Sequence, residues 1–333
     1  MRDHGFHRVR VTRVVAETAD ASSFVLDAPF VYEAGQFCTF RVVIDGVTQL
    51  RSYSMSSAPG VDDEFQVTVK RVPGGPVSNW LLDNVQAGTE VELTYPAGVF
   101  RLTAGHADLV AFAGGSGITP VHSLLKSALA DTSRGVRLLY ANRDADSTIF
   151  AAELAALEAK FGERLAVTHR YDAEHGFVDA EAVTAFVGAD NGADFYICGP
   201  GPYMDIVEGA LLALGAPAER IHVERFTPAA PEPAAAIETD PAAAQVTVEL
   251  GGKRATGAHH RGTTLLQMAR QLGMSPPYSC ESGSCATCMA RLVDGTVKMQ
   301  VNNALTDDEV TEGWVLTCQS VPTSATVHVI YED

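Results

Sequence analysis

Four cysteines near the carboxyl end have a spacing that suits an iron–sulfur cluster. Four residues separate Cys280 from Cys285, two separate Cys285 from Cys288, and Cys318 follows after a further twenty-nine. The arrangement C-x4-C-x2-C…C is that of plant-type [2Fe–2S] sites. Such a loop must turn tightly and aim backbone N–H groups at the bridging sulfides, which favours small side chains. Five small residues stand between the first three cysteines: Ser282, Gly283, Ser284, Ala286 and Thr287.

A zinc site is the alternative for these thiols. Zinc sites usually combine two C-x2-C units, whereas this chain offers one such unit and an offset Cys280. The spacing therefore favours the cluster. A fifth cysteine, Cys38, lies within the strand-like run QFCTFRV and is interpreted as a small buried hydrophobe rather than a ligand.

The segment RSYSMSSAP, residues 51–59, has side chains that could hold a flavin. Arg51 and Tyr53 stand at alternate positions, so a strand would project both to one side. Arg51 could pair with a phosphate and Tyr53 could stack on an isoalloxazine ring. Ser54 could offer its hydroxyl to flavin N5, where hydride arrives. Taken alone, the segment is an ordinary strand that ends in a turn.

A second motif, KRVPGGPVSNWL at 70–81, places a glycine turn before a helix. A helix N-terminus that follows such a turn can bind an anion. Gly75, Val77 and Ser78 would then present backbone and hydroxyl groups to a flavin pyrophosphate. The turn alone is common in many folds.

Two further motifs suit a nicotinamide cofactor. In AFAGGSGITPVHSLL, residues 111–125, an apolar strand meets a glycine-rich turn of the form G-x-G-x-x-P that opens a helix. In FYICGPGPYM, residues 195–204, Cys198 follows a strand directly and should lie at the carboxyl edge of a parallel sheet, where ligands bind. Read in isolation, Cys198 is a buried cysteine before a turn.

The elements that must position these motifs form three units. Short alternating runs over residues 7–100 predict an antiparallel β-barrel capped by a helix at 77–85. From Asp108, strand–helix alternation predicts a parallel sheet with helices on both faces. A Pro- and Ala-rich segment then predicts a semi-extended tether to a small mixed domain. The predicted units are the flavin domain 1–104, the nucleotide domain 105–227, the tether 228–243 and the cluster domain 244–333.

Composition excludes some classes of function. At 333 residues the chain is too long for one core, and its formal net charge of −17 argues against nucleic-acid binding. No run of eighteen apolar residues predicts a membrane span, and the polar stretch at residues 1–10 does not resemble a secretory signal. We therefore expect a cytoplasmic protein, and we expect it to be a monomer.

The order of these motifs resembles one family. RSYS, GGPVS, GGSGITP and CGP, followed by the four cysteines, are similar to the ferredoxin–NADP reductase superfamily in its fused form, over essentially the whole chain. The segments YANRDADSTIF, VERF and VKMQVNNALTDDEV most resemble the reductases of 3-ketosteroid 9α-hydroxylases, with phenylacetyl-CoA epoxygenase reductases as near relatives. The resemblance implies FAD on a six-stranded barrel, NAD(P)H on the second domain and a β-grasp ferredoxin domain.

The resemblance also implies site residues. Catalytic candidates are Ser54, Cys198 and Glu224, with Cys198 near the nicotinamide ring and Glu224 near the open face of the flavin. Cofactor contacts are expected from Arg51, Tyr53, Ser54, Gly75, Val77, Ser78, Gly115, Gly117, Thr119, Cys198 and Phe226. Metal ligands are expected to be Cys280, Cys285, Cys288 and Cys318.

The nicotinamide specificity has one open point. The end of the second parallel strand offers Asn142 and Arg143 rather than an evident acidic residue for a ribose 2′-hydroxyl. An arginine there could accept a 2′-phosphate, so NADPH stays possible. The resemblance favours NADH, and Ser-Ser-Ala-Pro after RSYSM favours FAD over FMN.

These observations together predict an electron-transfer reductase. We expect electrons to pass from NADH through FAD and a [2Fe–2S] cluster to a Rieske-type terminal oxygenase. The reductase of a diiron monooxygenase is the alternative enzyme. A zinc-stabilised flavoprotein scaffold is the alternative from a different class.

Overall fold

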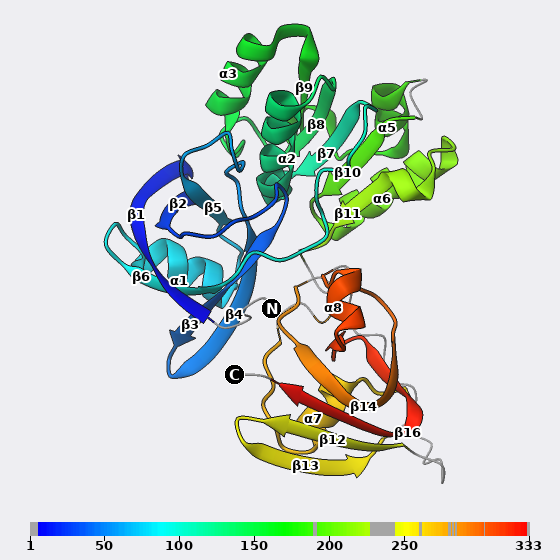
Figure 1. Cartoon of the computed structure of the whole chain (residues 1–333). Helices are drawn as coiled ribbons and strands as arrows, with labels where there is room; N and C mark the ends of the chain where they lie inside the picture. The colour runs from blue at the N-terminus through cyan, green and yellow to red at the C-terminus, as the bar shows by residue number, and fades with distance from the viewer. Residues whose placement is uncertain are drawn as a thin grey trace.

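The computed structural model describes residues 6–188, 192–226, 244–259, 262–278, 281, 283, 285–302 and 304–331. The predicted tether and the predicted ligand Cys280 lie outside the described residues. Three sheets organise the chain: one of six strands, one of five parallel strands and one of five mixed strands. In Figure 1 the first two stand side by side, with the third below them.

The N-terminal sheet is the predicted antiparallel barrel. Its strand order is β4-β3-β6-β1-β2-β5. A bridge between Met55 and Val67 joins the end of β4 to β5 and closes the sheet. Alternate side chains fill the interior, among them Cys38, which is fully buried with its Sγ 3.8 Å from the Met55 Sδ, as predicted. The elements are β1 (Phe6–Thr18), β2 (Ala21–Asp27), β3 (Phe37–Ile44), β4 (Val47–Ser54), β5 (Phe65–Lys70), α1 (Pro76–Asn84) and β6 (Glu90–Thr94).

The central sheet is parallel, in the order β11-β10-β7-β8-β9, and helices cover both faces as predicted. Leu109, Ala111 and Ala113 of β7 pack with α2 and α3, whereas Val110 and Phe112 pack with α5 and α6. Because both faces are covered, β7 is a continuous apolar run. The elements are β7 (Leu109–Gly114), η1 (Gly115–Gly117), α2 (Ile118–Asp131), β8 (Val136–Asn142), α3 (Ala151–Phe161), η2 (Gly162–Arg164), β9 (Leu165–Tyr171), α4 (Asp172–His175), α5 (Ala180–Val187), β10 (Asp194–Cys198), α6 (Gly201–Ala213), η3 (Ala218–Arg220) and β11 (Ile221–Glu224).

The C-terminal sheet has the order β13-β12-β16-β14-β15, with β12 and β16 parallel and the other pairs antiparallel. Helix α7 packs on it through Leu265, Met268 and Ala269, and a capping box between Thr264 and Gln267 starts that helix. The elements are β12 (Gln245–Leu250), β13 (Lys253–Ala258), α7 (Leu265–Gln271), β14 (Met289–Met299), α8 (Asp307–Thr311), β15 (Trp314–Leu316) and β16 (Ser320–Tyr331).

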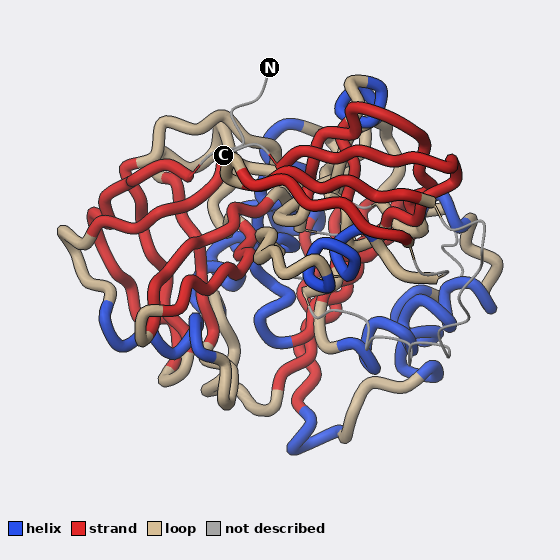
Figure 2. Tube along the Cα trace, turned by 90° about the horizontal axis from the view of Figure 1, so that it is seen from below, coloured by secondary structure: helices blue, strands red, loops and turns tan. Residues whose placement is uncertain are grey.

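In the view from below in Figure 2, the barrel strands lie at the left and the C-terminal sheet at the upper right. The predicted fold class is confirmed, whereas the residue boundaries assigned to the domains stay predictions. Within the described part of the chain, no helix is both long enough and apolar enough to cross a bilayer.

Candidate flavin, nicotinamide and cluster sites

The predicted flavin strand is β4, and its neighbour β3 fixes which way its side chains point. Arg51 pairs with Phe40 and Tyr53 with Cys38, so Arg51 and Tyr53 lie on one face, as the alternation predicted. The Tyr53 ring meets the Phe40 ring edge-on with centroids 5.6 Å apart. Arg51 is exposed, and its guanidinium donates to the Leu50 carbonyl at 2.6 Å.

Ser54 ends β4 in an unusual state for a hydroxyl. The residue is 1% exposed, and its Oγ has no hydrogen-bond partner among the described residues. A buried unpaired hydroxyl costs about 1–3 kcal/mol. Its position therefore suits a bound group that supplies the missing partner, as the flavin prediction requires.

The predicted pyrophosphate loop is held by its own hydrogen bonds. The Ser78 Oγ accepts from the Val72 N–H at 3.1 Å, and the Asn79 Nδ2 donates to the Gly75 carbonyl at 2.6 Å. Val77 packs into the barrel core. The Ser78 hydroxyl is thus used within the loop, and no side chain of the described residues caps α1. The first-turn N–H groups of α1 are the donors that this loop can offer an anion.

The glycine-rich turn and the Cys198 loop touch at the carboxyl edge of the parallel sheet. A Cβ added to Gly117 would lie 2.1 Å from the Cys198 carbonyl oxygen, so only glycine fits there. Thr119 is buried, and its Oγ1 donates to the Ser116 carbonyl at 3.1 Å. The Tyr140 hydroxyl donates to the Gly115 carbonyl at 3.2 Å and holds the turn from β8.

Cys198 and Glu224 are neighbours across two parallel strands. They are paired in the register of β10 with β11, and both are buried. Burial, and secondarily the Glu224 charge, raise the pKa of the Cys198 thiol well above its usual range. Cys198 is therefore a neutral thiol at physiological pH. Phe226 follows two residues after Glu224 and is 40% exposed.

The end of β8 is where a nucleotide ribose would be recognised. Asn142 is buried there. Arg143 is exposed and lies 3.5 Å from Asp144 and 4.0 Å from Asp20, a residue of the barrel. The Arg143 guanidinium thus has carboxylates on two sides.

The cluster loop brings three predicted ligands together. Cys285, Cys288 and Cys318 are buried, and the Cys288 and Cys318 thiols are hydrogen bonded. The described side chains form no group of three that converges on one metal ion. A two-iron cluster instead divides four thiolates between two metals. Gly283, with φ of +79°, has no room for a Cβ, which would lie 2.7 Å from the Val301 carbonyl oxygen, in agreement with the predicted tight turn.

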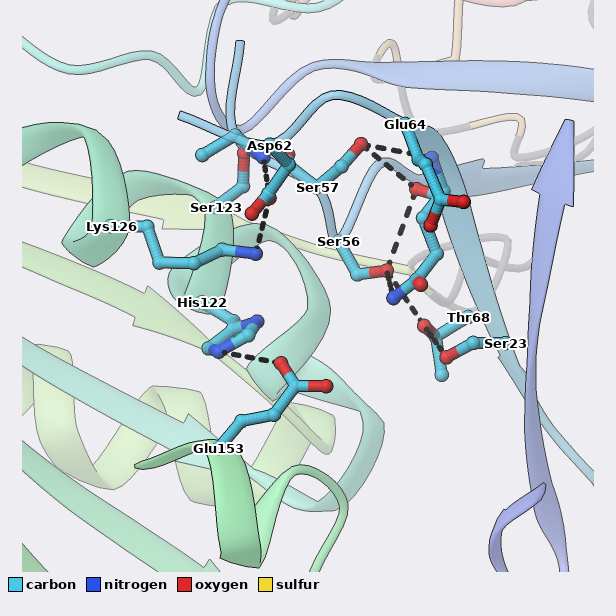
Figure 3. A network of polar contacts seen from close by, with 12 residues as sticks. Ser23, Ser56, Ser57, Asp62, Glu64, Thr68, His122, Ser123, Lys126 and Glu153 are labelled. Atoms are coloured by element: carbon cyan, nitrogen blue, oxygen red, sulfur yellow. Dashed lines mark hydrogen bonds and ion pairs between the residues drawn. The ribbon is translucent and has the colours of Figure 1, made fainter. Parts of the chain in front are cut away.

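The flavin strand and the glycine-rich turn face one interdomain boundary. The Ser123 Oγ, four residues after Thr119, donates to the carbonyl of Ser57, three residues after Ser54, at 2.6 Å. Figure 3 shows this barrel–nucleotide interface, where Lys126 pairs with Asp62 at 2.5 Å. Beside it, within the nucleotide domain, His122 approaches Glu153 at 3.5 Å. Sequence reasoning missed Ser123 and Lys126 because their partners lie in the barrel. It missed the contact between His122 and Glu153 because the two residues come from different helices, which leaves no local pattern.

A cavity of about 550 Å³ lies at the same interface. Five of its eleven lining residues are carboxylates, including Glu17, Asp63 and Glu153, and none of the predicted cofactor-binding residues lines it. Glu17 and Glu153 have raised pKa values because burial penalises their charged forms. This hollow is therefore separate from the predicted cofactor contacts.

These features fit the three predicted groups: an unpaired buried hydroxyl, a helix start with available N–H groups, a close-packed glycine turn at a sheet edge and converging thiols. The class of protein they define is a flavin- and iron–sulfur-containing oxidoreductase. Comparisons with known proteins agree. Family models match at three places: the oxidoreductase FAD-binding domain at residues 8–102, the oxidoreductase NAD-binding domain at 112–209 and the 2Fe-2S iron-sulfur cluster binding domain at 248–323.

Similar proteins span the chain from end to end. The ferredoxin reductase component of 3-ketosteroid-9-alpha-monooxygenase from Mycobacterium tuberculosis is 39% identical, covering 98% of this chain and 96% of that protein. A component of the 1,2-phenylacetyl-CoA epoxidase from Escherichia coli is 30% identical, covering 98% of each. The solved structure of phthalate dioxygenase reductase aligns with a TM-score of 0.63 and 27% identity, covering 98% of each chain.

This chain belongs to the ferredoxin–NADP reductase-like family of flavin reductases fused to a C-terminal [2Fe–2S] domain. It is a nicotinamide-dependent oxidoreductase with FAD, NADH and a [2Fe–2S] cluster as its cofactors. The predicted family, enzyme class and cofactors are thus confirmed. The roles assigned to individual site residues stay predictions.

Proposed function

We propose that this chain is the reductase component of an oxygenase system, which passes electrons from NADH through FAD and its own cluster to a separate Rieske-type terminal oxygenase. One observation carries the proposal. All three cofactor domains lie in one chain, and 98% of that chain matches a 39% identical monooxygenase reductase component. Steroids or aromatic compounds are the substrate classes that we propose for the partner.

The proposed roles of FAD and the cluster follow from the number of electrons that each can carry. FAD, when bound, accepts a hydride and releases its electrons singly, which suits a cluster that holds one. The chain's own residues orient the reactants. We assign Arg51, Tyr53 and the α1 N-terminus to holding the flavin, and Ser54 to donating its unpaired hydroxyl.

The nicotinamide side of the proposal rests on close packing. Gly115, Gly117 and Thr119 shape the turn on which the dinucleotide would lie, and Gly117 lets that turn contact the Cys198 backbone. Because Cys198 is buried with a raised pKa, we assign it a packing and hydrogen-bonding role beside the nicotinamide rather than that of a nucleophile. Glu224, which pairs with Cys198 on the adjacent strand β11, is assigned to the same side of the nicotinamide site.

A diiron monooxygenase is the alternative partner. The 30% identity to the 1,2-phenylacetyl-CoA epoxidase component over 98% of this chain supports it. The higher identity to the steroid monooxygenase reductase favours the first proposal.

Reconstitution tests the proposal. The purified holoenzyme is mixed with a Rieske-type steroid or aromatic oxygenase or with a diiron oxygenase, and product is followed with NADH and with NADPH. We expect turnover with the Rieske-type partner and a preference for NADH. Turnover only with the diiron enzyme would support the alternative, and failure to reduce either partner, with a fully reducible cluster, would contradict the reductase role.

Ser54→Ala tests the flavin assignment separately. Removing a buried hydroxyl that has no partner among the described residues should leave the flavin-free protein as stable as before or up to about 1–3 kcal/mol more stable. The same change should slow flavin reduction by NADH. Ser56→Ala is the matched control, because the Ser56 Oγ is already hydrogen bonded to Thr68 at 2.7 Å. That variant should lose stability, and a Ser54 variant that loses stability in the same way would contradict the assignment.

A further inference from the structure

The cluster loop touches the barrel at two points with matching spacing. Phe37 of β3 packs against Cys285 in a small apolar cluster with Ala97. Two residues further along each segment, the Thr39 and Thr287 hydroxyls lie 3.4 Å apart. Phe37 and Thr39 share one face of the strand because side chains alternate. The loop therefore lies along β3 over at least these two positions.

The barrel side of this contact belongs to the same strand pair as the flavin motif. Phe37 stands directly opposite Ser54, and Thr39 directly opposite Ser52, in the antiparallel register of β3 and β4. The Thr39 and Ser52 hydroxyls are 2.9 Å apart. Directly opposite residues on antiparallel strands have Cβ atoms about 4.5–5.5 Å apart. Phe37, which contacts the predicted cluster ligand Cys285, is thus the direct cross-strand neighbour of Ser54, whose hydroxyl has no partner among the described residues.

The contact between the cluster loop and β3 is also weak enough to open. Phe37 and Thr39 are both buried, at 3% and 2% exposure, where the loop meets the barrel. Neither contact is an ion pair. A neutral hydrogen bond contributes about 0.5–1.5 kcal/mol. Such a contact can position a domain without holding it permanently.

We propose that Phe37 and Thr39 are positioning residues that dock the cluster loop for electron transfer within the chain, with Cys285 as the ligand presented to the flavin side. The inference rests on the proposed function and adds a docking surface to it. Electron transfer slows steeply with distance, so losing the docked arrangement slows reduction of the cluster. It leaves reduction of the flavin by NADH unchanged, because the nicotinamide site lies on the other domain.

Rapid mixing of the holoenzyme with NADH, followed by absorbance, separates two steps: reduction of the flavin by NADH and then reduction of the cluster by the flavin. In the second, the flavin loses one electron and the cluster gains it. Phe37→Ala should slow this step about tenfold, and Phe37→Leu, which restores apolar volume, should recover most of the rate. Val43→Ala is the control: Val43 is exposed on the same face of β3, beyond the loop contact. An unchanged second step in Phe37→Ala would overturn the proposal.

Two further measurements distinguish loss of docking from a change in the cluster itself. The electron paramagnetic resonance spectrum and the midpoint potential of the cluster should be those of the wild type in every variant. Solution X-ray scattering should give a larger radius of gyration for Phe37→Ala than for Val43→Ala. A wild-type radius in Phe37→Ala would contradict docking even if the rate falls.

A double-mutant cycle with Thr39→Val and Thr287→Val covers the case in which Phe37→Ala does not fold. The two changes should slow the second step non-additively, because either one removes the same hydroxyl pair. Additive effects would contradict the pairing. If the wild-type cluster is never reduced, the proposed function fails; if it is reduced and all variants match it, only the docking surface fails.

Discussion

The barrel meets its two neighbours in different ways. Towards the parallel sheet, it contributes Ala21, Ala34 and Phe100 to a common apolar core. Buried polar side chains cross the same boundary, where Ser123 bonds to Ser57 and Lys126 pairs with Asp62. Towards the C-terminal sheet, its contacts with the described residues include an apolar contact at Phe37 and a hydroxyl pair at Thr39. Figure 1 shows the corresponding arrangement, with the C-terminal sheet set apart from a paired barrel and parallel sheet.

The difference matches what each boundary has to do. Hydride transfer needs two reactants held in one geometry, which a shared core provides. A cluster that serves both an internal donor and an external acceptor benefits from a contact that opens. We therefore expect changes at the barrel–nucleotide interface to alter stability, and changes at the cluster-loop contact to alter electron transfer with little effect on stability.

The largest expected effect is at Arg134. This side chain is 1% exposed, donates to Asp194 at 2.6 Å and donates to the Thr103 carbonyl in the segment that joins barrel to sheet. Arg134→Met removes the buried cation from Asp194, whose remaining partners among the described residues are the Thr103 hydroxyl and the more exposed Arg220. We expect a loss of up to about 3–5 kcal/mol in the free energy of unfolding, measured by urea denaturation.

The control for Arg134 uses the same carboxylate. Arg220 lies 3.7 Å from Asp194 but is 40% exposed at its side chain, so Arg220→Met should cost at most about 1 kcal/mol. Equal losses in the two variants would show that burial does not set the strength of the ion pairs to Asp194.

Ser123→Ala should have the next largest effect. It removes the donor to the Ser57 carbonyl and leaves a buried acceptor unpaired, a loss of about 1–3 kcal/mol. Ser127 provides a matched control one turn along α2, since its buried hydroxyl has no partner among the described residues. Ser127→Ala should be neutral or stabilising in the same urea experiment. A destabilised Ser127 variant would contradict this explanation.

His122 makes the same interface sensitive to acid. Burial first, and then the Lys126 charge, lower the pKa of His122 well below its usual range, so the folded protein keeps the ring neutral. The unfolded chain binds a proton near pH 6.5, and stability therefore falls as the pH drops below that value, by up to about 1.4 kcal/mol per pH unit.

The measurement compares the wild type with His122→Gln between pH 7.5 and 5.5. Glu153, which faces the ring from α3, has a pKa raised by burial and opposes the trend at lower pH, so the comparison stops at 5.5. The Phe150 ring, stacked on His122 at 4.4 Å, carries no charge. We expect a flatter pH profile for His122→Gln; parallel profiles would exclude His122 as the source.

The sequence predicted what depends on local pattern. Period-two runs predicted the barrel strands, strand–helix alternation predicted the parallel sheet, and the cysteine spacing predicted the cluster. The helix expected at 77–85 is α1, Pro76–Asn84. Ser54 was also predicted from its motif, but only the structure reveals that its hydroxyl is buried and has no partner among the described residues.

What the sequence could not predict depends on contacts between distant segments. The strand β11 has four residues, too few for a recognisable period, yet its register sets Glu224 beside Cys198. His122 and Lys126 read as ordinary helix residues, and their burial follows from a barrel loop sixty residues earlier in the chain. Phe37 and Thr39 look like any strand residues until the cluster loop lies on them.

The smallest expected effect concerns the predicted tether at 228–243. If the cluster-loop contact is weak, docking depends on how often the tethered domain returns to β3. Doubling the length of the Pro- and Ala-rich segment should cost about 0.6 kcal/mol of closure free energy, roughly a threefold loss in the docked fraction. Rapid mixing with NADH should show up to a threefold slower cluster reduction, at an unchanged rate of flavin reduction and unchanged urea stability of the barrel–nucleotide unit. Unchanged cluster reduction would mean that docking is saturated and tighter than its contacts imply, and a loss of stability would mean that the third domain supports the other two.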